Sequence, residues 1–303
     1  MKRLFAFALV LCGVFAGWLA ARPTTLAAAA ETSAVQADRA LGAAFEKGDS
    51  VAVNRLLDAE FTWIDTDGIM YERPDALRAG LKPLIPNTSP VNDIKTIEHR
   101  YAGGKVVWVQ NNQGNKWAAH IWVQRPAGWR LLHANEIATR PADPISNVRP
   151  DYAVPCTNPC REVPYKPISA SEQAALAAWQ DQEGANGPGH HDMHIGDNVV
   201  VISSTTTTPR PSATAPGPTP VNPAASNRPP VGAAPALWVR TWDFGDAVVA
   251  IMIQPTYGGK AYWSSRIFGN HNGFWKMEES YHTTIQASPR MTALPTSVER
   301  SSR

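Results

Sequence analysis

The feature that most constrains this fold is an internal repeat, because the second half of the chain follows the sequence pattern of the first. Three pairs of segments align without a gap, namely residues 120–139 with 266–285, 43–45 with 177–179, and 104–109 with 245–250. The repeated unit is much longer than the roughly 20–50 residues of a solenoid repeat. The alternative is chance similarity between two β-hairpins, but the matched segments also keep the same order. We therefore expect two copies of one domain in a single chain.

Within the first copy, hydrophobic spacing predicts helices followed by a β-meander. Apolar residues recur at near-helical spacing between residues 34 and 59, and Lys47-Gly48-Asp49 interrupts them. Asp49 or Ser50 is a suitable N-cap for a second helix. A strand (61–65), a short helix (74–81) and four β-rich segments (94–101, 105–112, 116–125 and 129–140) follow. This order predicts an α+β fold of two cone-shaped domains, each a curved antiparallel sheet packed on N-terminal helices around a hollow.

Composition divides the rest of the chain into domains and connecting segments. We place the first domain at 34–140, a linker at 141–168, the second domain at 169–287 and a disordered tail at 288–303. Residues 203–236 contain nine prolines and few large apolar side chains, so we expect a disordered insertion there. The insertion stands where the first copy has its short helix. The first copy is therefore the better candidate for a closed pocket.

The N-terminus predicts export. Lys2 and Arg3 precede an apolar run over residues 4–20, and a tract of small residues ends at Ala30, which is the order of a secretory signal peptide over 1–30. We expect a periplasmic or secreted protein with no stable membrane anchor after cleavage. The alternative is an uncleaved anchor, since the apolar run approaches the length of a membrane span. In an oxidising compartment, Cys156 and Cys160 predict one local disulfide within the linker.

Charge and motif content exclude several classes of function. The formal net charge is +2 and basic residues do not cluster, so we expect no nucleic-acid partner. The sequence has no phosphate-binding loop and no dinucleotide fingerprint, so we expect no cofactor. His190, His191 and His194 are ligand types of a transition-metal site. Glycines just before them oppose the helix that would align them, so we expect no metal.

A family resemblance follows from motifs in the first copy. The pattern runs through Phe45, Lys47-Gly48-Asp49, residues 60–65 (EFTWID), Gly68 and residues 128–133 (GWRLLH). It resembles the SnoaL-like branch of the nuclear transport factor 2 (NTF2) superfamily, which includes ketosteroid isomerase and polyketide cyclases. The resemblance covers residues 34–139 well and 169–286 more loosely. It implies the cone fold and pairing through the outer sheet faces, as an internal pseudo-dimer of the two halves or as a homodimer, and it says little about activity.

Strand alternation indicates a candidate ligand pocket in the first copy. On the last strand, Trp129, Leu131, His133 and Asn135 share a face, because alternate residues of a strand point the same way. The same parity adds Phe61, Trp63 and Asp65 on the first strand, His99 and Tyr101 on the second, and Trp117 beyond them. We expect these side chains to surround a small, partly apolar molecule.

Three of these residues are candidates for catalysis. If Asp65 lay near His133, it could orient the imidazole as a general base while Tyr101 stabilised an oxyanion. That set would suit an isomerase, cyclase or dehydratase. The alternative is that His133 is a polar residue at a strand end and Asp65 begins a turn. The sequence leaves three functions open: a ligand-binding or association protein without catalysis, which we favour, a proton-transfer enzyme, and a structural envelope module.

Overall fold

A computed structural model describes residues 33–80, 82–85, 94–140, 166–183, 194–204, 210–211, 236, 238–254 and 261–286. Several sequence predictions lie outside these residues and stay predictions: the signal peptide over 1–30, the Cys156–Cys160 disulfide, the tail over 288–303, and any role of His190 and His191. Within the described part of the chain, no helix is long and apolar enough to cross a membrane.

Local capping defines the helices of the first half. Helix α1 (Ala34–Lys47) starts where the Ser33 hydroxyl accepts the N–H of Gln36, and it ends at Gly48, whose φ of 66° suits a residue without a Cβ. Helix α2 (Ser50–Leu56) follows at once, with the carboxylate of Asp49 as its N-cap. Helix α3 spans Arg73–Ala79 and has a proline in its first turn. The predicted interruption of the helical pattern at Gly48 is confirmed.

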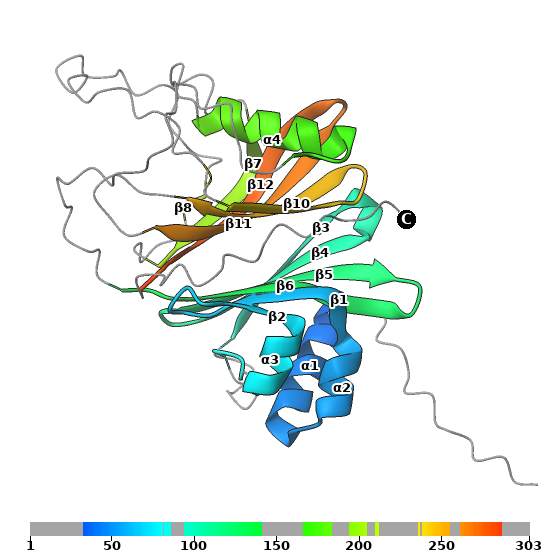
Figure 1. Cartoon of the computed structure of the whole chain (residues 1–303), viewed down its shortest axis with the longest axis vertical. Helices are drawn as coiled ribbons and strands as arrows, with labels where there is room; N and C mark the ends of the chain where they lie inside the picture. The colour runs from blue at the N-terminus through cyan, green and yellow to red at the C-terminus, as the bar shows by residue number, and fades with distance from the viewer. Residues whose placement is uncertain are drawn as a thin grey trace, which may run out of the picture. The chain divides into compact units, whose positions relative to one another are not determined.

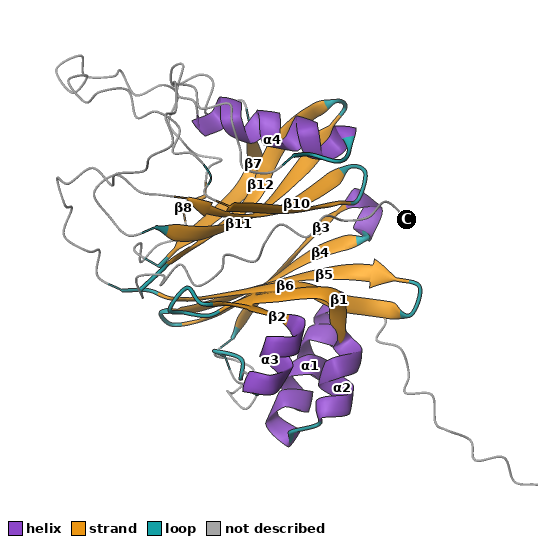
Figure 2. Ribbon diagram, viewed as in Figure 1, coloured by secondary structure: helices purple, strands orange, loops and turns teal. Residues whose placement is uncertain are grey.

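The first sheet contains six strands and is mostly antiparallel (Figure 2). Its order is β2-β1-β6-β5-β4-β3, and its one parallel pair joins β1 to β6. A short 3-10 turn over Ala102–Gly104 links β3 to β4. The strands are β1 (Leu57–Ile64), β2 (Met70–Glu72), β3 (Lys95–Tyr101), β4 (Val106–Gln113), β5 (Lys116–Arg125) and β6 (Gly128–Ala138).

The second sheet repeats this topology. Its order, β8-β7-β12-β11-β10-β9, is that of the first sheet strand for strand, which is consistent with a duplicated domain. Strand β8 falls inside the stretch predicted to be disordered, where it pairs with β7 as an edge strand that tolerates a proline. The elements are α4 (Ala170–Glu183), β7 (Ile195–Ser203), β8 (Arg210–Pro211), β9 (Trp238–Asp243), β10 (Ala247–Gln254), β11 (Tyr262–His271) and β12 (Phe274–Thr284).

The predicted α+β fold in two domains is confirmed, with helices covering one face of each sheet (Figure 1). In the first half, α1, α2 and α3 bury an apolar cluster against the sheet that includes Leu41, Phe61 and Trp122. In the second half, α4 does the same with Leu176 and Trp179. Each domain therefore has its own core between helix and sheet, as an independent folding unit requires.

The opposite faces of the two sheets share a third apolar cluster. It combines first-sheet residues such as Trp108 and Ile121 with second-sheet residues such as Val249 and Ile267, all fully buried. The rings of Trp108 and Tyr281 meet edge to face with centroids 4.9 Å apart. The two sheets thus bury one common core, within the unit that spans Glu31–Arg303.

A β-bulge in β6 changes which residues share a face. Ile121 of β5 pairs with His133, whereas the next residue, Trp122, pairs with Leu131, so Leu132 is an extra residue. Before the bulge, Leu131 packs in the core under the helices. After it, His133 points to the other sheet and donates to or accepts from Ser265. The predicted common face of Trp129, Leu131, His133 and Asn135 is therefore wrong, because one added residue inverts the alternation.

We propose that the shared cluster pairs the two sheets within one chain, and Trp108→Ala tests this. Trp108 is completely buried between the sheets, so its loss is expected to lower the free energy of unfolding by about 3–5 kcal/mol. Denaturant unfolding of the purified chain measures the change, and sedimentation is expected to show a monomer. Val51→Ala, at a side chain 79% exposed, serves as the control and should change stability by less than about 0.5 kcal/mol. A cost below about 1 kcal/mol for Trp108→Ala would contradict the proposal.

Candidate functional site

His133 lies between the two sheets. Its Nδ1 is 2.8 Å from the Thr62 hydroxyl and its Nε2 is 2.8 Å from the Ser265 hydroxyl. Burial, together with the charges of His120 and Arg240, lowers the pKa of His133 to about 3 despite the opposing effect of Thr62, so the ring is neutral at physiological pH. Both ring nitrogens are thus used in a network that bridges the two halves.

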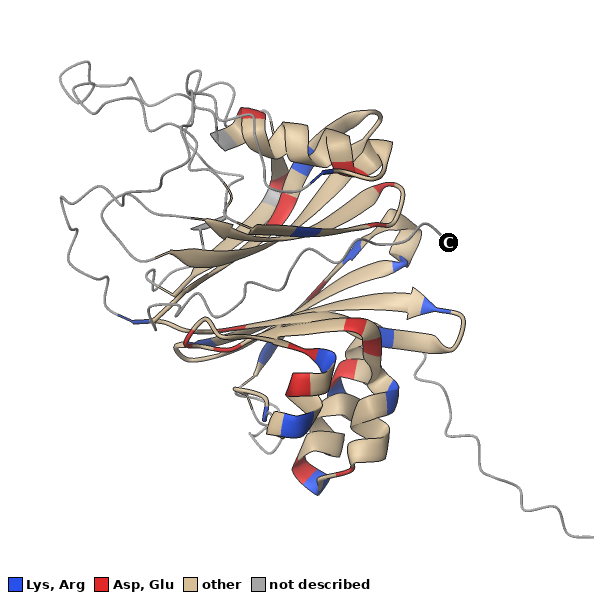
Figure 3. Cartoon of the chain, in the orientation of Figure 1, with Lys and Arg blue, Asp and Glu red and all other residues tan. Residues whose placement is uncertain are grey.

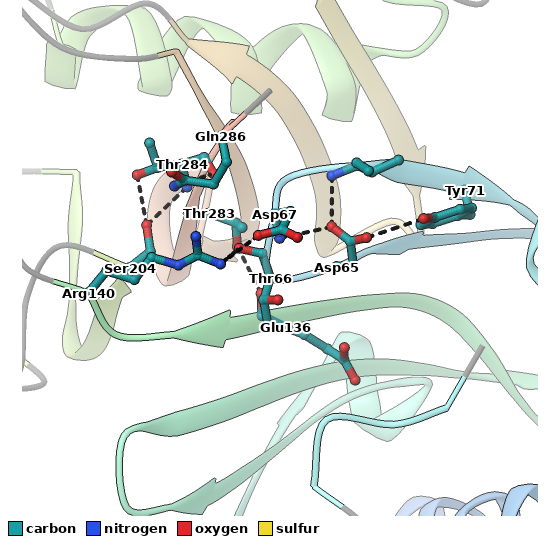
Figure 4. Close-up of polar contacts among 11 residues, drawn as sticks. Asp65, Thr66, Asp67, Tyr71, Glu136, Arg140, Ser204, Thr283, Thr284 and Gln286 are labelled. Atoms are coloured by element: carbon teal, nitrogen blue, oxygen red, sulfur yellow. Dashed lines mark hydrogen bonds and ion pairs between the residues drawn. The ribbon is translucent and has the colours of Figure 1, made fainter. Parts of the chain in front are cut away.

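Asp65 begins the turn between β1 and β2 (Figure 4). Its carboxylate accepts the N–H groups of Asp67 and Ile69, both at 2.9 Å, and the hydroxyl of Tyr71 at 3.3 Å. These bonds are those of a turn-forming aspartate. The structure does not bring Asp65 and His133 into hydrogen-bond contact within the described residues.

Tyr101 and His99 also face the second half of the chain. The Tyr101 hydroxyl donates to Oε1 of Glu279 at 2.8 Å, and Nδ1 of His99 bonds to the same oxygen. Glu279 is fully buried, and burial raises its pKa even though His99 and Tyr101 act in the opposite direction. Asp65, Tyr101 and His133 therefore take part in three separate polar contacts, and no common site joins them among the described residues.

The predicted ligand-contacting residues divide between the two sheet faces. Phe61, Trp63, Trp129 and Leu131 lie in the core under the helices. The other residues lie on the face between the two sheets. His99 bonds to Glu279, Asn135 bonds to Ser265 and Thr283, and Trp117 packs against the shared cluster. Two of the first group, Trp63 and Leu131, line a cavity, which gives the candidate site its position.

This cavity lies between α1 and the helix-covered face of the first sheet. Its volume is about 310 Å³, which is at the lower end of the range of small-molecule sites. Apolar side chains supply much of the wall, and polar ones are grouped in it. The lining includes the polar residues Asp38, Asn111 and His120 and the apolar residues Phe45, Trp63 and Ala118.

A hydrogen-bonded carboxylate organises the polar part of the cavity. Asp38 of α1 accepts from three groups of the facing strands: Nδ1 of His120 at 2.5 Å, Nδ2 of Asn111 at 2.9 Å and Nε1 of Trp122 at 3.0 Å. The side chains of Asp38 and His120 are 11% and 10% exposed, so the ion pair is almost enclosed. Three donors on one carboxylate fix the position of α1 over the sheet as well as the imidazole orientation.

The pKa values of this pair diverge from their ordinary values. Burial alone would raise the pKa of Asp38, but the charge and hydrogen bond of His120, together with Asn111 and Trp122, hold it below its usual value. Burial alone would lower the pKa of His120, yet the Asp38 carboxylate raises it overall. An imidazole held by Asp38 through Nδ1 presents Nε2 to other groups, and no described residue bonds to that nitrogen.

A second carboxylate lies next to the cavity. Glu136 of β6 accepts the backbone N–H of Leu84 at 2.6 Å, and the neighbours of Leu84, Pro83 and Ile85, line the cavity. Burial raises the pKa of Glu136 to about 7, against the lowering effects of the Leu84 amide and of His120. A carboxyl group that titrates near neutral pH beside an Asp–His pair is an arrangement typical of proton-transfer sites.

Sequence reasoning missed Asp38, His120 and Glu136, although weak signals were present. Asp38 lies one residue after buried Ala37 and three before buried Leu41, so a charged side chain at the edge of the buried face of α1 needs a partner. His120 lies between apolar neighbours in β5. What the sequence could not supply is the bulge, without which Glu136 is assigned to the wrong face.

His194, the described member of the predicted weak metal cluster, uses both ring nitrogens. Its Nδ1 donates to the carbonyl of Trp275 and its Nε2 bonds to Asp181, each at 2.9 Å. Over the described residues, no group of three or more His, Cys, Asp or Glu side chains could hold a metal ion. Figure 3 shows Lys and Arg interspersed with Asp and Glu on the helices of the first half, and mostly uncharged residues along the strands.

Comparison with known proteins gives structural similarity only. No protein-family model and no curated protein matches the sequence. Solved structures that match include an NTF2-like protein from Cytophaga hutchinsonii (13% identity, 34% of this chain, 93% of that chain, TM-score 0.27). Another is an NTF2-like protein of unknown function in nutrient uptake from Rhodospirillum rubrum (23%, 35%, 98%, 0.28). A third, from Bacteroides fragilis, covers more of the chain (8%, 84%, 96%, 0.20). All three are described as NTF2-like, the superfamily that the sequence pattern resembles.

Asp38→Asn tests the electrostatics of the cavity. The variant keeps the shape of the side chain and removes its charge, so the pKa of His120 is expected to fall as burial becomes dominant. An NMR pH titration of the imidazole protons measures this shift. Asp75→Asn removes an exposed carboxylate paired with Arg78 and should leave the pKa of His120 unchanged.

Asp38→Asn is also expected to change how the stability of the fold depends on pH. The raised pKa of His120 stabilises the fold below the unfolded value of about 6.5, and this contribution is lost as pH rises through the folded value. The lowered pKa of Asp38 stabilises the fold above about pH 4, and this is lost as pH falls through the folded value. The difference between wild type and variant should therefore be largest between about pH 4 and 6.5. A difference that grows above neutral pH would contradict the assignment.

Proposed function

We propose that the first half of the chain binds a small, partly apolar molecule in the cavity between α1 and its sheet. The observation that carries this proposal is the imidazole of His120, which lines the cavity and is held through Nδ1 by Asp38 while Nε2 has no partner among the described residues. A nearly enclosed imidazole that is bonded only through Nδ1 can use Nε2 for a hydrogen bond with a ligand oxygen. The proposal is for binding without catalysis.

The walls of the cavity support a ligand of mixed polarity. Phe45, Trp63 and Leu131 offer apolar and aromatic surface, whereas Asn111 and His120 offer polar groups on one side. Small sites commonly combine an apolar lining with a few convergent polar groups that set orientation. We therefore propose a compact molecule that bears a carbonyl or hydroxyl group and places that oxygen toward His120.

A thermal-shift screen with compact carbonyl and hydroxyl metabolites tests the proposal. A ligand that binds only the folded state adds about 2.7 kcal/mol of stability at 100 times its Kd, so a true ligand should raise the Tm. Ala118→Leu places a larger side chain in the cavity wall and should abolish the shift. Ala127→Leu makes the same change at an exposed turn position and should preserve it. A shift that persists in Ala118→Leu would place the ligand elsewhere.

A proton-transfer activity is the second candidate, and the pKa of Glu136 favours it. Asp38 makes His120 a stronger base, and Glu136 with a pKa of about 7 can give or take a proton at physiological pH. Both groups belong to the same side of the first sheet. Such a pair would suit removal of a proton next to a carbonyl group and its return at a neighbouring atom, which is an isomerisation.

Hydrogen exchange separates this activity from binding alone. A ligand identified by the thermal screen is incubated with the protein in D₂O, and NMR follows deuterium entry at carbon next to the carbonyl. If His120 acts as the base, exchange should be fast in wild type and fall by at least about 100-fold in His120→Gln. His271→Gln changes the exposed histidine at the end of β11 and should leave the rate unaltered. Exchange at the buffer rate in wild type would exclude the activity and leave the binding function.

A further inference from the structure

A second cavity lies in the first half, on the other side of two aromatic residues. It has a volume of about 220 Å³ and lies among α1, α2, α3 and β1. Its lining is largely apolar and includes Phe45, Phe61, Trp63 and Ala76, with Ser50 and Lys82 at its polar part. The function proposed above makes no use of this space.

Phe45 and Trp63 separate the two cavities, since both side chains line each of them. Their rings meet edge to face with centroids 5.8 Å apart, and Phe61 packs against Trp63 in the same way at 6.1 Å. Edge-to-face pairs of this kind stabilise the wall between the cavities beyond the burial of the rings. The two cavities therefore differ in chemistry, because the first contains the Asp38–His120 pair and the described lining of the second has no carboxylate.

The size and lining of the second cavity suit a hydrocarbon chain. An apolar cavity of about 150 Å³ is enough to bind benzene, so this one accepts a longer molecule. Apolar walls without fixed polar partners favour a ligand that contributes surface area and no internal hydrogen bonds.

One cation in the lining defines the polar end of the ligand. Lys82 lies three residues after the end of α3 and is exposed, so its ammonium group can stay hydrated while its stem covers apolar surface. Among the described residues that line the cavity, the other polar groups are the Ser50 hydroxyl and the indole N–H of Trp63. A positive charge beside an apolar chamber complements an amphipathic anion.

We propose that this second cavity binds the alkyl chain of a medium-chain carboxylate, with the carboxylate beside Lys82. The chain lies among α1, α2 and α3, and its end contacts the wall formed by Phe45 and Trp63. The site is independent of the cavity at His120, so the absence of a ligand for that cavity leaves this proposal standing.

Calorimetric titration of the whole mature chain with sodium hexanoate, octanoate and decanoate tests the proposal. Each added methylene should tighten binding about fourfold until the cavity is full, so octanoate should bind about 15-fold more tightly than hexanoate. Octylamine should bind at least about tenfold more weakly than octanoate, because its charge repels Lys82. Affinity that is independent of chain length, no binding at all, or equal affinity for octylamine would overturn the proposal.

Two pairs of variants locate the site. Ala76→Leu fills the cavity from α3 and should weaken octanoate binding at least about tenfold, whereas Ala79→Leu, on the exposed side of the same helix, should not change it. Lys82→Gln does not disturb the core and should weaken octanoate about two- to fivefold while leaving 1-octanol unchanged; Lys105→Gln is its control. If Asp38→Asn abolishes octanoate binding and Ala76→Leu does not, the acid occupies the other cavity and the proposal is wrong.

Discussion

The structure depends on each sheet being buried on both faces. Helices cover one face of each sheet, and the other two faces share a core rich in Trp, Ile and Val. An unpaired polar group inside that shared core costs several kcal/mol, so the hydrogen bonds that are made there contribute to stability. His133 remains neutral between Thr62 and Ser265, and Oε1 of Glu279 is bonded to His99 and Tyr101, while its Oε2 has no partner among the described residues. These bonds require particular partners, so they fix how one sheet lies on the other.

The same constraint explains where chemistry can arise. Residues between the sheets are held by partners from both halves, so they are poorly placed to meet a ligand. The helix-covered face of the first sheet differs, since small residues such as Gly42, Ala118 and Ala76 leave space there and Asp38 holds His120 beside it. Several tryptophans, including Trp108, Trp238, Trp242 and Trp263, lie in the shared core, so they do not fill the cavities.

The two copies have diverged on their helix-covered faces. At the position aligned with His120, the second half has Arg266, which is almost fully buried and donates to Oε1 of Gln254 at 3.0 Å. At the position aligned with Glu136 it has His282, whose pKa burial lowers to about 3 and which bonds to the Ser280 hydroxyl. A neutral histidine replaces a titrating carboxyl group, and an arginine replaces an imidazole. The acid–base pair of the first half is therefore not repeated, although the strand order is.

The sequence allowed the fold to be predicted because its signals are long and redundant. Apolar and β-rich stretches of eight to eleven residues define β4, β5 and β6, and the second copy repeats them. The site was mislocated because a single residue decides it. The bulge at Leu132 inverts every side chain after it, so His133 and Asn135 point between the sheets, whereas Glu136 points toward the helices.

An equivalent bulge occurs at Glu278, where Ile267 pairs with Glu279 and Phe268 with Met277. The sequence does not reveal this bulge, because both faces of β12 are buried and apolar residues therefore occur on each of them. The direction of the Glu279 side chain follows from the pairing of β12 with β11.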